Sequence, residues 1–165
     1  MTGRSDLDPV ARQTMTVDTI IKTLRLEPHP EGGLFRETYR HKPDDGGRGS
    51  STAIYYLLRE GEKSHWHRVT DADEIWHYYA GAPLQLLIAD PGLPALPHFL
   101  GPDITASQRP QITVPANCWQ SAESLGAWTL VGCTVSQAFE FSSFEMAPPS
   151  WRPPPSLKKA REQRK

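Results

Sequence analysis

The chain has 165 residues, of which 38% are hydrophobic and 22% charged, and its formal net charge is −1. The length fits one domain that can bury its own core, and no apolar run approaches the roughly 18 residues that a membrane-spanning helix needs. Residues 148–165 have a net charge of +5, which leaves −6 for the rest of the chain. A nucleic-acid-binding domain would instead place positive charge on its folded face, so we expect no nucleic-acid partner and no membrane partner.

One helix is predicted, near the N-terminus. Thr16 is a suitable N-cap, and Val17, Ile20, Ile21 and Leu24 are spaced to form a single apolar stripe. The next prolines along the chain end this helix.

Short runs rich in aromatic, aliphatic and β-branched residues follow the helix and alternate with turn-forming clusters. About ten such runs, with no second long helix, predict an all-β antiparallel sandwich or barrel. The predicted strands span residues 34–40, 52–58, 64–68, 74–79, 84–89, 98–100, 111–114, 118–122, 128–135 and 139–146.

Composition divides the chain into three parts. Residues 1–15 lack periodicity and are predicted to be a flexible arm, and residues 16–147 form the domain. Residues 148–165 are rich in proline and then basic, which predicts a disordered tail. The arm lacks the apolar segment of a signal peptide, and neither cysteine has a CxxC partner, so we expect a cytoplasmic protein.

The stretch His65-Trp66-His67, followed by Glu74, carries the clearest chemical signal. On a regular strand, His65 and His67 project from the same face because side chains alternate. Glu74 begins the next apolar run, and by the same alternation Trp76 shares its face. Two imidazoles and a carboxylate would then converge on one small volume.

These residues resemble a known family. His65-x-His67, then Glu74, six residues and Gly81 resemble the first cupin motif, and residues 115–120 resemble the second. The match is closer to the branch called cupin-5, a domain of unknown function. Stretches similar to that branch are residues 31–40, 54–58, 66–69, 73–77 and 130–133.

The resemblance implies a cupin double-stranded β-helix, that is, a jelly-roll barrel, with the short N-terminal helix added. It also implies one concave pocket and a homodimer. It implies no activity, because cupins include epimerases, isomerases, dioxygenases, storage proteins and sensors. The sequence departs from the standard motifs at the six-residue gap before Glu74, at Asn117 in place of glycine, and at Gln120 in place of the fourth ligand histidine.

Three interpretations of the site remain open. In the first, His65, His67, Glu74 and Gln120 bind a divalent metal such as Zn, Mn, Fe or Ni. Such a centre with two histidines and one carboxylate is also the ligand set of non-haem iron oxygenases.

In the second interpretation no metal is needed. His67, paired with Glu74, abstracts a proton next to a carbonyl, and a tyrosine returns one on the opposite face. Tyr78 shares the alternation of Glu74 and is the predicted catalytic tyrosine, with Tyr55 and Tyr79 as the other candidates.

In the third interpretation the pocket only binds a small molecule. The residues that would stack on the ligand are Trp66, Trp76, Tyr78 and Trp119, and Tyr55 is a further predicted substrate-binding residue. Gln120 and Arg36 would hydrogen-bond it, and the Arg36 guanidinium suits a carboxylate or phosphate.

Our working hypothesis is an isomerase or epimerase that acts on a sugar-like or oxo-acid substrate. The alternatives are a non-catalytic ligand- or metal-binding protein and a metal-dependent oxygenase. The remaining histidines, His29, His41 and His98, are predicted to be exposed, and His77 is placed outside the site.

Overall fold

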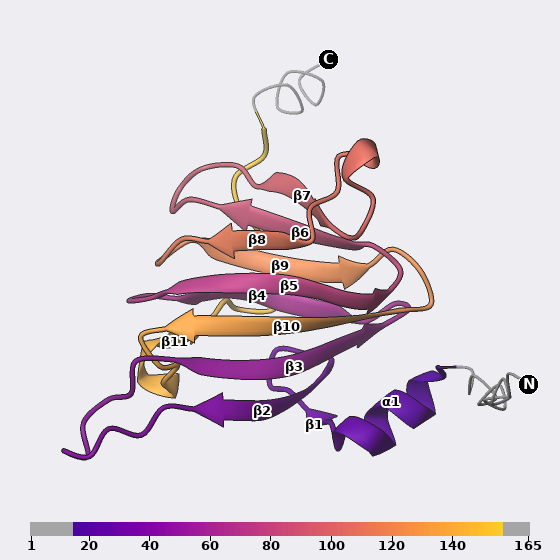
Figure 1. The fold of residues 1–165 in the computed structure, drawn as a ribbon. Coiled ribbons are helices and arrows are strands. Elements are labelled where there is room, and N and C mark those ends of the chain that lie inside the picture. The colour runs from indigo at the N-terminus through magenta and orange to yellow at the C-terminus, as the bar shows by residue number, and fades with distance from the viewer. Residues whose placement is uncertain (1–14, 157–165) are drawn as a thin grey trace, which may run out of the picture.

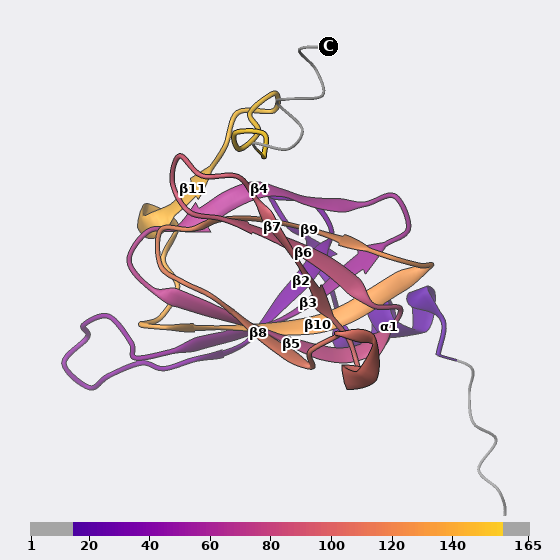
Figure 2. The ribbon, with the colours of Figure 1, turned by 90° about the horizontal axis from the view of Figure 1, so that it is seen from above.

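The computed structural model describes residues 15–156, in which two antiparallel sheets face each other (Figures 1 and 2). One sheet has the strand order β1-β2-β3-β10-β5-β8, and the other has the order β11-β4-β9-β6-β7. The all-β jelly roll with one short helix is therefore confirmed. None of the helices in residues 15–156 is long and apolar enough to cross a membrane.

The strands and the short 3₁₀ helices follow the helix α1 (Val17–Leu24) in this order: β1 (Glu27–Pro28), β2 (Leu34–Arg40), β3 (Thr52–Arg59), β4 (Lys63–Val69), β5 (Asp73–Gly81), β6 (Leu84–Ala89), β7 (Leu96–Leu100), η1 (Ile104–Ala106), β8 (Gln111–Val114), β9 (Trp119–Ser124), β10 (Trp128–Ser136), η2 (Phe141–Ser143) and β11 (Phe144–Met146).

The helix forms for the reasons that the sequence indicates. The Thr16 side chain accepts a hydrogen bond from the backbone N–H of Thr19, and Arg25 ends the helix in the left-handed conformation. Ile20 is buried against Leu57 and Leu130, so α1 covers the outer side of β3 and β10 at one end of the six-stranded sheet (Figure 1).

The main core lies between the sheets. Trp76 and Tyr56 are its largest fully buried side chains, and their rings meet edge to face at 5.8 Å. Leu84, Leu86 and Val131 pack beside them. Burial of a large apolar side chain contributes about 1.5–3 kcal/mol to the free energy of unfolding. This core therefore holds the two sheets together.

The prediction of one strand over residues 139–146 is wrong in its first half. Residues Phe141–Ser143 form η2, and only Phe144–Met146 pair with β4. The backbone carbonyls of Ala138 and Phe139 instead accept hydrogen bonds from Arg48 and Arg40. Because side chains satisfy these groups, the segment needs no strand partner.

The β-bulges in β2 and β4 decide which side chains of these two strands face inward. A register shift in β2 lies between Glu37 and Tyr39, and another in β4 lies between Ser64 and His67. A bulge adds one residue and reverses the alternation beyond it. Arg40 therefore joins Phe35 and Glu37 on the inner face, although simple alternation would place it outside.

Gly32 permits the loop between β1 and β2 to pass close to β4. Its φ is +108°, and an added Cβ would overlap the backbone carbonyl of Lys63. We expect Gly32→Ala to lower the free energy of unfolding by about 1–3 kcal/mol, measured by urea denaturation. Gly46 also has positive φ but has open space around it, so Gly46→Ala is the control. Equal losses in the two variants would show that the close approach to Lys63 does not matter.

The predicted tail begins with a packed segment. Trp151 lies on Trp119 and Trp66, with ring centroids 4.5 and 5.7 Å away. The tail was predicted to be disordered from Pro148 onward, but Trp151 packs against the domain. The predicted arm up to residue 14 and the tail from residue 157 lie outside the described residues.

Candidate functional site

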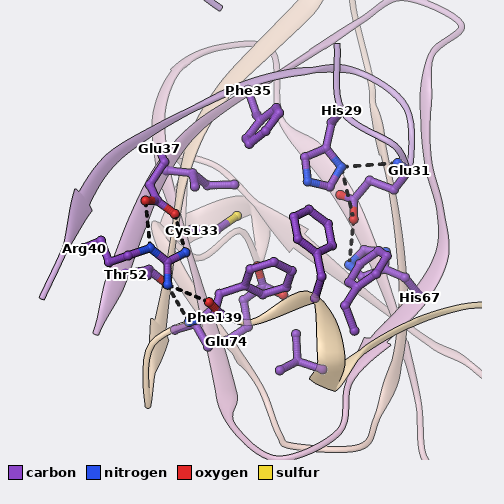
Figure 3. A pocket seen from close by; sticks show the side chains of 15 residues that line it. His29, Glu31, Phe35, Glu37, Arg40, Thr52, His67, Glu74, Cys133 and Phe139 are labelled. Carbon is purple, nitrogen blue, oxygen red and sulfur yellow. Dashed lines mark hydrogen bonds and ion pairs between the residues drawn. The ribbon is translucent and has the colours of Figure 1, made fainter. Parts of the chain in front are cut away.

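A cavity of about 80 Å³ opens between the two sheets, at the end where β2, β4 and η2 approach one another. Its wall combines buried acids and histidines with four phenylalanines (Figure 3). The lining residues are His29, Glu31, Phe35, Glu37, Arg40, Thr52, Ile54, His67, Val69, Glu74, Cys133, Val135, Phe139, Phe141 and Phe144.

The shortest contact between titratable groups that lie deep in this cavity joins His67 and Glu31. Nε2 of His67 lies 3.2 Å from Oε2 of Glu31, and both side chains are buried. Nδ1 of His67 lies 2.8 Å from the backbone carbonyl of His65. A carbonyl only accepts, so Nδ1 carries a proton and donates it.

This geometry requires a further proton between the two residues. A neutral His67 that is protonated at Nδ1 has a lone pair at Nε2, and an ionised Glu31 has lone pairs at Oε2. Two lone pairs at 3.2 Å repel, so one proton must lie between Nε2 and Oε2. The pair is therefore either carboxylic acid with imidazole or carboxylate with imidazolium.

Burial decides between these two forms. It raises the pKa of Glu31, against the opposing effects of the nearby His29 and of a hydrogen bond from Ser64. It lowers the pKa of His67, against the opposing effect of Glu74. Both directions favour neutral groups, so we assign the shared proton to Glu31, which donates it to His67.

His29 packs beside this pair rather than being exposed as the sequence predicts. Its Nδ1 accepts a hydrogen bond from the backbone N–H of Glu31, and its ring meets Phe35 edge to face at 4.4 Å. Burial lowers the pKa of His29, with Glu31 opposing and His67 adding to the shift. At neutral pH His29 is uncharged, and the contact of its Nδ1 with Glu31 Oε2 at 3.7 Å is not an ion pair.

Glu74 brings a second carboxyl group to the cavity from β5. Its Oε2 accepts a hydrogen bond from Nε2 of Gln120 at 2.6 Å, and Oε1 of Gln120 accepts one from the Trp76 indole at 2.8 Å. The buried chain Trp76–Gln120–Glu74 thus fixes the carboxyl orientation. Burial raises the pKa of Glu74, and the nearby His67 and the Gln120 hydrogen bond oppose this rise.

Arg40 and Glu37 lie on the solvent-exposed side of the cavity. Nε and Nη2 of Arg40 donate to the two carboxylate oxygens of Glu37 at 2.9 and 2.6 Å. Nη1 donates to the backbone carbonyl of Phe139 at 2.9 Å, and Thr52 accepts the Phe139 N–H. These bonds fix the backbone of Phe139, whose side chain lines the cavity (Figure 3).

The structure does not bring the four predicted metal ligands together. The bulge in β4 places His67 inside and His65 outside, where its Nε2 donates to the backbone carbonyl of Ala147 at 3.0 Å. The expectation that both histidines share one face is therefore wrong. The side-chain amide of Gln120 is bound at both ends: its Nε2 donates to Glu74, and its Oε1 accepts from Trp76.

No group of three His, Cys, Asp or Glu side chains in residues 15–156 has a geometry that could hold a metal ion. Because His65 is directed to the Ala147 carbonyl and Gln120 is bound to Glu74, the predicted set of His65, His67, Glu74 and Gln120 does not fit a divalent cation.

The aromatic residues predicted to bind substrate lie elsewhere. Trp66 and Trp119 pack with Ala89, Ala147 and Trp151 in a separate cluster that does not line the cavity. Trp76 is in the main core and reaches the site only through Gln120. The aromatic wall is built from phenylalanines instead.

The predicted tyrosines and Arg36 also lie outside the cavity. Tyr78 donates its hydroxyl hydrogen to the carbonyl of Gly81, and Tyr55 packs edge to face on Tyr79. Arg36 is exposed, since it alternates with Phe35 and Glu37 on β2. The arginine of the cavity is Arg40, beyond the bulge.

Glu31, His29 and the phenylalanines were not assigned to the site from sequence. Glu31 does lie in the stretch 31–40 that resembles the family, and the Gly-Gly pair after it signals a tight loop. No local pattern shows that this loop crosses to β4, because that approach depends on the backbone hydrogen bond from His65 to Glu31.

Comparison with known proteins places the chain in a family. No curated protein matches it. A protein from Shewanella oneidensis is 40% identical, with a TM-score of 0.77, over 81% of this chain and 85% of that one. A hypothetical protein from Leishmania major is 31% identical, with a TM-score of 0.72, over 81% and 88%.

A more distant likeness shows a shared fold alone. Oxalate decarboxylase from Bacillus subtilis is 13% identical with a TM-score of 0.56, over 72% of this chain and 29% of that one. The family model Cupin_5, Cupin superfamily (DUF985), matches residues 18–147. With that match and the two closely similar structures, the chain belongs to the cupin-5 family.

Proposed function

We propose that this chain is a small-molecule enzyme of the isomerase or epimerase type, which moves a proton on a carbon next to a carbonyl group. The observation that carries the proposal is the buried Glu31–His67 pair at the cavity wall, in which Nε2 of His67 lies 3.2 Å from Oε2 of Glu31. A second buried carboxyl group, Glu74, lines the same cavity.

The two carboxyl groups suit complementary roles. Glu74 takes the proton from carbon, because a carboxylate with a raised pKa is a stronger base at neutral pH. The proton between Glu31 and His67 is donated to the developing oxyanion of the carbonyl, with His67 close enough to return it. Isomerisation of a hydroxy-carbonyl substrate is completed when Glu74 gives its proton to the former carbonyl carbon of the enediol and the Glu31–His67 pair takes the proton of the neighbouring hydroxyl, which becomes the new carbonyl. Both groups then return to their starting protonation states.

The surroundings support this use of the carboxyl groups. Four phenylalanines line the cavity, and an apolar lining lowers the local dielectric and strengthens hydrogen bonds to the developing charge. The chain Trp76–Gln120–Glu74 holds the base in one orientation. A tyrosine is not required in this scheme. The homodimer and the cytoplasmic location stay predictions.

Deuterium exchange tests the proposal directly. The protein is incubated in D₂O with a panel of small aldehydes, ketones, sugars and oxo acids, and incorporation of deuterium next to the carbonyl is followed by NMR. We expect incorporation into at least one compound, lost in His67→Ala and kept in His98→Ala, since His98 is exposed on β7.

Two results would count against an enzyme of this class. Incorporation that survives His67→Ala would remove the pair from the reaction. Binding of a compound at the cavity without incorporation for any member of the panel would favour the non-catalytic ligand-binding alternative.

A further inference from the structure

The charges around the cavity are unbalanced in a way that bears on the substrate. Three carboxyl groups line it, from Glu31, Glu37 and Glu74. Among its described lining residues Arg40 is the single lysine or arginine. His29 and His67 add no positive charge at neutral pH, because burial lowers the pKa of each.

The edge of the Arg40 guanidinium formed by Nε and Nη2 is already occupied. A guanidinium binds a carboxylate best through two parallel N–H donors. Here the pair Nε and Nη2 is already bound to both oxygens of Glu37, and Nη1 is bound to the Phe139 carbonyl. Figure 3 shows these bonds between Arg40, Glu37 and Phe139.

An anionic substrate would therefore find Arg40 already paired with the Glu37 carboxylate. It would leave water for a cavity lined by phenylalanines and by two buried carboxyl groups, Glu31 and Glu74. A buried carboxyl group offers no positive charge when protonated and repels the anion when ionised. Placing like charges together costs several kcal/mol, whereas an uncharged carbonyl compound meets a hydrogen-bond donor and an acceptor.

We infer that the site accepts uncharged hydroxy-carbonyl compounds and rejects carboxylates and phosphates, and that Glu37 sets this selection by occupying the binding edge of Arg40. The inference rests on the proposed function for the reaction but concerns binding alone. Of the two substrate classes suggested by the sequence, it favours the sugar-like compounds over the oxo acids.

Matched pairs of uncharged and anionic probes test the selection. Propionamide with propionate and benzamide with benzoate share shape and differ in charge. Their binding at pH 7 is measured by chemical-shift titration of the labelled protein. We expect each amide to bind at least about tenfold more tightly than its carboxylate, since tenfold corresponds to about 1.4 kcal/mol.

Substitution at Glu37 should change the selection. In Glu37→Gln the Arg40 edge is released, and binding of the carboxylates should tighten about tenfold or more. In the double variant Glu37→Gln/Arg40→Gln that gain should disappear. Glu62→Gln is the matched control, because Arg59 and Glu62 form an ion pair of the same sequence separation that does not line the cavity.

Three binding results would contradict the charge selection. Carboxylates that bind the unmodified protein as tightly as the amides, amides that do not bind, or a Glu37→Gln variant with no gain would overturn the inference. Amide selection without deuterium exchange in the full panel would contradict the proposed function and leave the charge selection standing. Deuterium exchange into an oxo acid would support the proposed function and contradict the charge selection.

Discussion

Replacement of Glu31 by glutamine is expected to slow deuterium exchange by about 10²–10⁴-fold, the usual contribution of a positioned acid or base. Glutamine has nearly the same shape and still accepts the hydrogen bond from Ser64. Its amide N–H can fill the gap to Nε2 of His67, but it cannot give up a proton. The fold should therefore persist while the exchange is lost.

Glu145→Gln is the control for this variant. Glu145 lies on β11, next to the lining residue Phe144, and pairs with Arg68 away from the cavity. If Glu31 and His67 act as one unit, the double variant Glu31→Gln/His67→Ala should be little slower than either single variant, since such effects are strongly non-additive. Full activity in Glu31→Gln, with an unchanged melting temperature, would show that the shared proton is not used.

The fold could be predicted because its determinants are local. Thr16 caps α1, alternating apolar residues mark the strands, and the motifs around His67 and Glu74 are continuous in sequence. The segment 139–146 was less predictable. Its aromatic composition is typical of a strand, but Arg40 and Arg48, about 100 and 90 residues earlier, bind its carbonyls.

The site was predicted only in part, and the reason is the pair of bulges. His67 and Glu74 do line the cavity, but alternation counted along an ideal strand also places His65 inside, and Arg36 was chosen from the wrong face of β2. The bulge in β4 turns His65 outward, and the bulge in β2 brings Arg40 to the face of Phe35 and Glu37; neither bulge has an obvious sequence signal. Glu31 enters from a loop, whose position depends on β4 and not on its own sequence.

Replacement of Glu74 by glutamine is expected to stabilise the folded chain at pH 8. Burial raises the pKa of Glu74 above its usual 4.5. Above pH 4.5 the unfolded chain ionises this carboxyl before the folded chain does, so the unfolded state is favoured as pH rises. The free energy of unfolding then falls by about 1.4 kcal/mol per pH unit, up to the raised pKa of the folded chain.

The sign of this effect distinguishes it from that of the histidines. His29 and His67 have pKa values lowered from 6.5, so their contribution is present above pH 6.5 and is lost as pH falls below it. The contribution of His29 cancels in the difference between the variant and the unmodified chain, because Glu74 is not among the causes of its shift. Loss of Glu74 lowers the pKa of His67 further, but this acts below pH 6.5 and leaves the comparison at pH 8 unchanged. The advantage of Glu74→Gln should be largest at pH 8 and shrink towards pH 4.5, measured by urea unfolding at each pH.

Glu62 provides a comparison of opposite sign. Its hydrogen bonds to Arg59 lower its pKa, so its carboxylate stabilises the fold above pH 4.5 and Glu62→Gln should cost stability at pH 8. A gain in Glu74→Gln that is the same at every pH would mean that packing, not ionisation, is its source. A pH-dependent gain would show that the chain keeps a buried carboxyl group that destabilises its fold. Loss of deuterium exchange in the same variant would show that this carboxyl group is kept for activity, since stability is often sacrificed where a site needs a strained or charged group.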